Sequence, residues 1–123
     1  MEEEKKAIVK IGNKEYELIL TTKATRAISK KFGGLTNLGK RLEDNSNVDE
    51  GLEDAIFLIT LLANQSILKD NYENGKNEPL LTEDQVELLT KPVDFVDFKD
   101  AILLALLNGT KREVVSEDTE KND

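Results

Sequence analysis

The sequence predicts a mainly α-helical domain with a small N-terminal β-hairpin, an α+β fold in which about five helices pack around a long central helix. Two observations carry this prediction. Near the N-terminus, apolar and polar residues alternate on both sides of a glycine-containing turn, as they do in paired strands. From about residue 22 onward, apolar residues instead recur every three or four positions, as they do on helices.

The expected hairpin has strands at residues 7–12 and 15–21. Ala7, Val9 and Ile11 alternate on one face of the first strand, and the intervening Gly-Asn-Lys has residues that tolerate the positive φ of a tight turn. A two-stranded hairpin is only marginally stable in water. We therefore expect it either to pack on the helices or to pair with a strand of another chain.

Two shorter helices follow the hairpin. Thr22 is the expected cap of a helix that ends near Phe32, where the Gly-Gly pair at 33–34 supplies a left-handed stop. Leucines at helical spacing predict a second helix over residues 35–42, and residues 43–47 are polar enough for a loop.

The longest helical pattern covers residues 48–72, and Asn47 with Glu50 resembles a capping box at its start. Between residues 56 and 63 this helix is apolar around most of its circumference, so we expect protein to surround it almost completely.

Polar residues at 53–54 and 64–65 interrupt the central helix, which keeps its apolar run below the roughly 20 residues of a membrane span. The amides Asn64 and Gln65 lie in its most apolar part. Either they hydrogen-bond to a neighbouring segment, or one of them points to water.

An exposed loop is expected at residues 71–78, followed by a second capping box, Thr82 with Gln85, that opens a short helix through Leu89. The Lys-Pro pair at 91–92 ends this helix.

Asp94 or Asp97 is the expected cap of the last helix, which runs to Asn108 with Gly109 as its stop. Its segment 101–107 is apolar on all sides, and it is the natural packing partner of the central helix.

The chain of 123 residues is expected to form a charged lead at 1–5, a single helical domain with its hairpin at 6–110, and a disordered charged tail at 111–123. The net charge of −8 argues against nucleic-acid and anionic-membrane partners. The absence of cysteine from the sequence removes disulfides and favours the cytoplasm.

The sequence contains no histidine and no cysteine, the commonest catalytic bases, nucleophiles and transition-metal ligands. The remaining carboxylates concentrate at expected helix starts, where the helix dipole favours them. Asp94, Asp97 and Asp100 recur every third residue but lack the glycine turn of a calcium loop. We therefore expect no enzyme activity, no metal and no cofactor.

The central helix and the last helix are the two most apolar, and the other expected helices are short and carry few apolar residues to cover them. Either a self-contained core absorbs their apolar surface, or an interface with a client or with another copy of the chain uses it. The candidate partner-binding residues are Phe57, Leu58, Leu61, Leu62, Leu103 and Leu106.

A hairpin written IVKIGNKEYELIL, followed directly by a helix ending KKFGGLTNLGKRL, resembles the tail assembly chaperones of long-tailed phages and prophages of Gram-positive bacteria. The most telling stretch is Gly12 to Leu38, and the layout corresponds over residues 6–110. The resemblance implies a small, mostly helical, non-enzymatic protein that keeps the tape measure protein soluble and helps to recruit tail-tube protein.

The same resemblance implies absence from the finished virion, and in many such genes a longer product made by ribosomal frameshifting. Two other functions remain open on the residues alone. One is a head-tail connector or tail-completion structural protein that stays in the particle. The other is a small acidic regulatory protein that binds a host factor.

Overall fold

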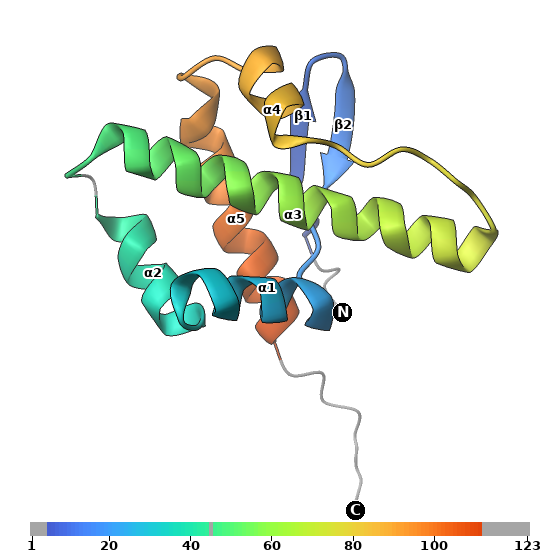
Figure 1. Cartoon of the computed structure of the whole chain (residues 1–123), viewed down its shortest axis with the longest axis horizontal. Coiled ribbons are helices and arrows are strands. Elements are labelled where there is room, and N and C mark those ends of the chain that lie inside the picture. Colours follow the sequence, from blue (N-terminus) through green and yellow to red (C-terminus); the bar gives the residue numbers. More distant parts are fainter. Residues whose placement is uncertain (1–4, 45, 112–123) are drawn as a thin grey trace, which may run out of the picture.

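The structure, a computed structural model, describes residues 5–44 and 46–111 (Figure 1). Most of the expected lead and tail, residues 1–4 and 112–123, lie outside the described residues. The expected fold class, mainly α with an N-terminal hairpin and a long central helix, is confirmed. The elements are β1 (Ile8–Ile11), β2 (Lys14–Glu17), α1 (Thr22–Phe32), α2 (Leu35–Glu43), α3 (Val48–Asn74), α4 (Glu83–Leu89) and α5 (Asp94–Thr110).

The two strands pair antiparallel around a two-residue turn, with Ile11 opposite Lys14 and Gly12 at a φ of 65°. The second strand is shorter than expected. The amide of Leu18 still donates to the carbonyl of Ala7 at 2.8 Å, and the chain then leaves the hairpin to reach the helices. There the amide of Ile19 donates to the carbonyl of Leu62 in α3 at 3.2 Å. The hairpin therefore packs on helices of its own chain, with β2 against α3 and β1 against α5.

The cap of α1 is one residue earlier than expected. The hydroxyl of Thr21 accepts the amide of Ala24 at 3.0 Å, and the same hydroxyl donates to the side-chain oxygen of Gln65. Gly33, at a φ of 86°, closes the helix as predicted. Thr21 thus fixes where α1 begins and also where it lies against α3.

Helix α3 runs through the middle of the molecule, with α5 crossing behind it and α1 and α2 along one side (Figure 1). It extends two residues beyond the predicted end, to Asn74, and Asn47 caps its start by accepting the amide of Glu50 at 3.0 Å. Leu58, Ile59 and Leu62 have no exposed surface. The expectation that its apolar centre is enclosed is confirmed.

By length and composition, α3 is also the one helix in residues 5–44 and 46–111 that is apolar enough to cross a membrane. This differs from the expectation, because the uncharged amides Asn64 and Gln65 interrupt the apolar run less than charges would. Half of its most apolar stretch is buried in the fold, as in the core helix of a globular domain.

The capping box of α4 forms as predicted. The Thr82 hydroxyl accepts the backbone amide of Gln85 at 3.1 Å, and the Gln85 side chain accepts the backbone amide of Thr82 at 2.8 Å. The helix ends at Leu89, shortly before Pro92.

Both predicted ends of α5 are wrong. No side chain caps its first turn, and the carboxylate of Asp94 instead accepts the amide of Lys91 at 2.8 Å. Gly109 lies inside the helix, which continues to Thr110. A Cβ atom at position 109 would lie 2.5 Å from the Cβ of Leu20, so this glycine serves a close approach and does not stop the helix.

Candidate functional site

The structure divides the six candidate binding residues between core and surface. Leu58 and Leu62 are fully buried, so their side chains are not available to a partner in this fold. Phe57 and Leu61 are half-buried beside α1. Leu106 is half-buried on α5, whereas Leu103 is 45% exposed.

Most of the apolar surface of α3 is covered by the chain itself. The Phe57 ring meets the Phe32 ring edge-on, with 5.9 Å between centroids, and the ammonium of Lys31 lies 5.0 Å from the centroid of Phe57. For this helix, the structure agrees with the self-contained core.

Helix α5 presents a different picture, because apolar residues occupy two opposite sides of it. Phe98, Ile102 and Ala105 are buried and form its inner side, against α3 and β1. The outer side carries five positions that we call the α5 stripe, namely Val93, Val96, Asp100, Leu103 and Leu107.

The positions of the α5 stripe are separated by three, four, three and four residues, which is the spacing of a coiled-coil seam. Val93 directly precedes the helix and has helical backbone angles, φ −65° and ψ −27°, so it continues the same face. The four aliphatic side chains are 69, 68, 45 and 58% exposed, in chain order. No described part of the chain covers this face.

The flanks of the α5 stripe are mixed. Asp97 and Leu104 border it on one side, and Lys99 and Leu106 on the other. The predicted residue Leu106 therefore lies at its edge, and Leu103 lies on it.

Sequence reasoning did not find Val93, Val96 and Leu107. Their signal was present in the three-four spacing from Val93 to Leu107, which continues across the N-terminal boundary of the helix. It was obscured because residues 101–107 are apolar on all sides, so the inner and outer faces of α5 could not be separated.

The largest exposed aliphatic side chains outside α5, among them Val48, Leu80 and Leu88, are spread over several elements. Single exposed apolar residues are normal on a globular protein. The four aliphatic residues of the α5 stripe instead form one row along a helix face, about 21 Å long at 1.5 Å per residue, with the spacing typical of helix-packing seams.

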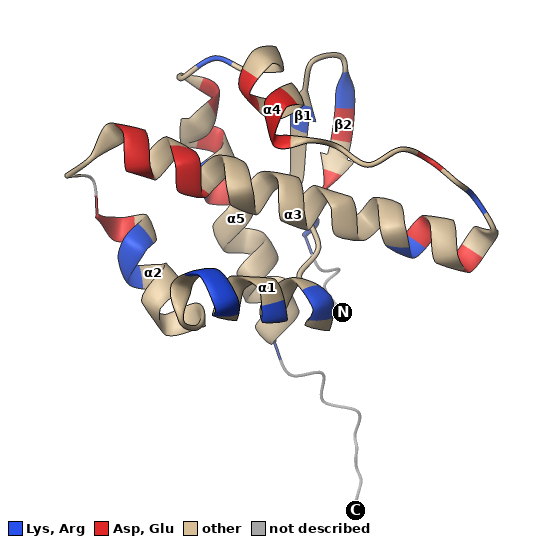
Figure 2. Ribbon diagram, in the orientation of Figure 1, with Lys and Arg blue, Asp and Glu red and all other residues tan. Residues whose placement is uncertain are grey.

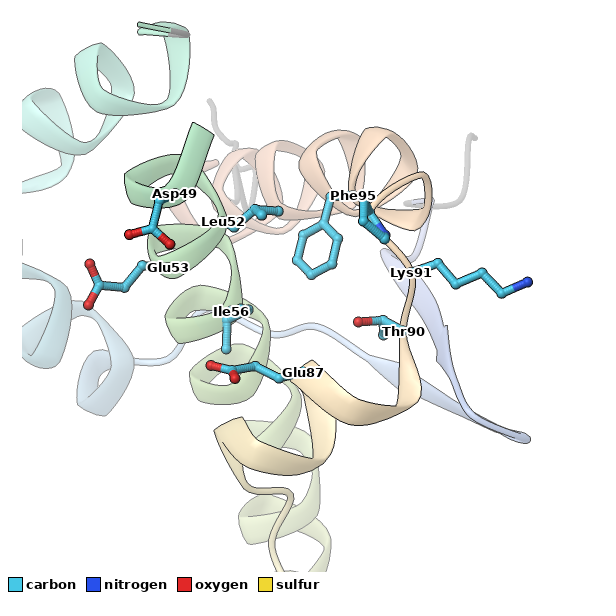
Figure 3. A pocket seen from close by; sticks show the side chains of 9 residues that line it. Asp49, Leu52, Glu53, Ile56, Glu87, Thr90, Lys91 and Phe95 are labelled. Carbon is cyan, nitrogen blue, oxygen red and sulfur yellow. The ribbon is translucent and has the colours of Figure 1, made fainter. Parts of the chain in front are cut away.

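A second surface feature is a hollow of about 370 Å³ between α3, α4 and the start of α5 (Figure 3). The Phe95 ring points toward α3, from which Leu52 and Ile56 come, and the side chain of Lys91 extends away. Asp49, Glu53 and Glu87 give the rim an acidic character. Within the described ranges, no group of three His, Cys, Asp or Glu residues is arranged to hold a metal ion.

Charge is unevenly distributed (Figure 2). Residues 18–42 contain six Lys and Arg residues and no Asp or Glu, which places positive charge along α1 and α2. The first half of α3 and α4 carry acidic residues. The net charge of −8 describes the chain as a whole and does not reveal this local basic surface.

The carboxylate of Asp54, only 4% exposed as a residue, is held by the guanidinium of Arg41 at 2.8 Å. This ion pair joins α2 to α3, and both of its residues line a hollow that Phe95 and Lys99 of α5 also line. Arg41, one of the six basic residues, therefore serves to hold two helices together.

Comparison of the chain with protein-family models, with curated protein sequences and with solved structures finds no match.

Proposed function

We propose that this protein is a non-enzymatic assembly chaperone that holds a helix of a client protein against the α5 stripe. The observation that supports this proposal is the row of four exposed aliphatic side chains at coiled-coil spacing on a helix whose opposite side is already buried. Such a helix is ready to pack against a second helix without any change in its own core.

The resemblance of the hairpin and the glycine-capped helix supplies the proposed client. In a phage tail assembly chaperone the client is the tape measure protein, a long helical protein whose apolar faces must be shielded until the tail tube forms around it. Tail-tube protein is the proposed second partner, and the bacterial cytoplasm the proposed location. A net charge of −8 helps to keep such a complex soluble.

Co-expression with a tape measure protein tests the proposal. The experimental variant is Val96→Glu/Leu103→Glu, which places two charges on the α5 stripe. The matched control is Val48→Glu/Leu88→Glu, which places the same charges at the more exposed Val48 and Leu88, 76 and 77% exposed, outside the stripe.

We expect the wild-type chain and the control to keep the tape measure protein in the soluble fraction and to co-purify with it. The α5-stripe variant should lose both properties while keeping the helical circular-dichroism spectrum of the wild type. If the stripe variant folds and retains the client, the proposed binding surface is wrong. Mass spectrometry of purified virions provides the second check, because a chaperone is absent from them and a connector or completion protein is present.

A further inference from the structure

The middle position of the α5 stripe is a charge. Asp100 is exposed, and two aliphatic residues precede it on the stripe and two follow it. Among the described residues, no Lys or Arg nitrogen lies within ion-pair distance of its carboxylate. A helix that covered the stripe would therefore enclose a carboxylate that has no cationic partner within the described part of its own chain.

Symmetry decides what can cover the stripe. Two copies of this chain that paired their stripes in parallel would place Asp100 of one copy opposite Asp100 of the other inside an apolar seam. In an antiparallel pair, Asp100 would instead face an aliphatic stripe residue of the other copy, Val96 or Leu103. Both arrangements are unfavourable, because the carboxylates lose water and no counter-charge faces them in the seam. A second copy is thus a poor occupant.

We propose that the α5 stripe takes a helix of a different protein that carries aliphatic residues at the same spacing and a Lys or Arg at the position facing Asp100. This inference rests on the proposed function and specifies the chemistry of the client segment. The central ion pair would compensate the carboxylate, and a polar residue at one seam position is a known determinant of register and partner choice. A client helix shifted by one heptad would leave Asp100 facing an aliphatic side chain.

The test uses three synthetic helical peptides of about 20 residues, which cover the stripe with some overhang. They share one Leu/Ile seam and differ only at the central position, which is Lys, Glu or Leu. Binding to the full-length chain is measured by fluorescence anisotropy at low salt. We expect the Lys peptide to bind about tenfold more tightly than the Glu peptide, the order expected for one interfacial charge pair.

Charge reversal in the protein provides the matched comparison. Asp100→Lys should invert the preference, so that the Glu peptide binds more tightly than the Lys peptide. Asp100→Leu removes the like-charge contact and should allow the chain to pair with itself, which sedimentation velocity detects as a dimer that the wild type does not form. Asp100 is exposed, so these variants leave the core unchanged.

Three outcomes would overturn the inference. One is equal binding of the Lys and Glu peptides, and another is failure of all three peptides to bind. The third is a dimer of the wild-type chain, seen by sedimentation velocity, that Val96→Glu/Leu103→Glu dissociates. Each of these leaves the proposed function standing if Val96→Glu/Leu103→Glu still abolishes capture of the tape measure protein. If the Val96→Glu/Leu103→Glu variant instead still captured the tape measure protein, the proposed function itself would be wrong.

Discussion

Asn64 and Leu81 exchange two hydrogen bonds: the Asn64 side chain donates to the Leu81 carbonyl and accepts from the Leu81 amide, each at 2.8 Å. The side-chain amide of Asn64 thereby pairs with the backbone of Leu81 as a neighbouring strand would. This pairing holds the segment that leads into α4 against α3. Gln65 similarly meets Thr21 at the start of α1. Of the two outcomes left open for these amides, the structure shows hydrogen bonding for both.

Replacing Asn64 by Ala should lower the free energy of unfolding by about 2 kcal/mol, because the backbone of the buried Leu81 loses both partners. Asn71 offers a matched control, since it makes the same two contacts with the backbone of the exposed Glu78, at 3.0 and 3.1 Å. There water can replace the side chain, so Asn71→Ala should cost about 0.5 kcal/mol or less. Urea denaturation measures both, and equal losses would contradict the argument.

Removing Arg41 should also destabilise the fold, by about 2 kcal/mol, because it leaves the carboxylate of Asp54 buried without its counter-charge. Part of the loss is packing, since the guanidinium lies 5.5 Å from the centroid of the Phe32 ring. Lys76→Ala breaks an exposed ion pair with Asp70, which solvent screens, and should cost much less stability. In a double-mutant cycle, Arg41→Ala/Asp54→Ala should cost less than the sum of the single changes; strict additivity would exclude the coupling.

Gly109→Ala should lower the melting temperature although alanine is favoured over glycine in a helix by about 1 kcal/mol. The added methyl group would meet Leu20, whose Cβ lies 2.5 Å from its position. Gly51→Ala is the control, because that helical glycine has nothing within 4 Å of an added Cβ, and it should raise the melting temperature. Leu20→Ala keeps the Cβ but removes the Cδ2 and Cγ atoms at 2.9 and 3.0 Å, so it should relieve only part of the loss at position 109. A stabilising Gly109→Ala would show that α5 and the Leu20 segment are not in close contact.

The end of α3 should respond to acid. Hydrogen bonds from Lys76 and Asn74 lower the pKa of the Asp70 carboxyl below its ordinary value. A lowered pKa means that the ionised form stabilises this turn above the ordinary aspartate value of about 4 and that the contribution disappears as the pH falls through the folded pKa. Amide hydrogen exchange at Gly75 and Lys76 should therefore lose protection in this acidic range, and Asp70→Asn should abolish the dependence. An unchanged profile in that variant would assign the effect to another group.

The elements that could be predicted from sequence are those whose causes are local. The turn at Gly12, the stop at Gly33 and the capping box of Thr82 and Gln85 depend on residues within one turn of each other, and all three form. The role of Gly109 depends on its contact with Leu20, about ninety residues earlier in the chain. The residues near position 109 therefore could not show that this glycine lies inside the helix and allows a close approach.

The exposed apolar face of α5, the proposed binding surface, was predicted only in part for the same reason. Helical spacing identifies which residues share a face, as with Leu58 and Leu62, but it does not say which segment covers that face. The structure encloses these two and leaves Leu103 exposed. Val93 and Val96 were missed because they lie at the boundary of the helix, where a predicted cap at Asp94 or Asp97 had placed its start.

The two ends of the described chain meet. The side chain of Asn108 donates to the carbonyl of Lys5 at 2.8 Å, while Leu20 presses on the same turn of α5. The two ends of the described chain therefore lie side by side. A circular permutant that joins Lys111 to Lys5 through a few glycines and opens in the loop after Gly75 should retain every helix and the hairpin. Its new termini would emerge at the C-terminal end of α3, away from the old ones (Figure 1), which provides a second place to attach a label or a fused domain.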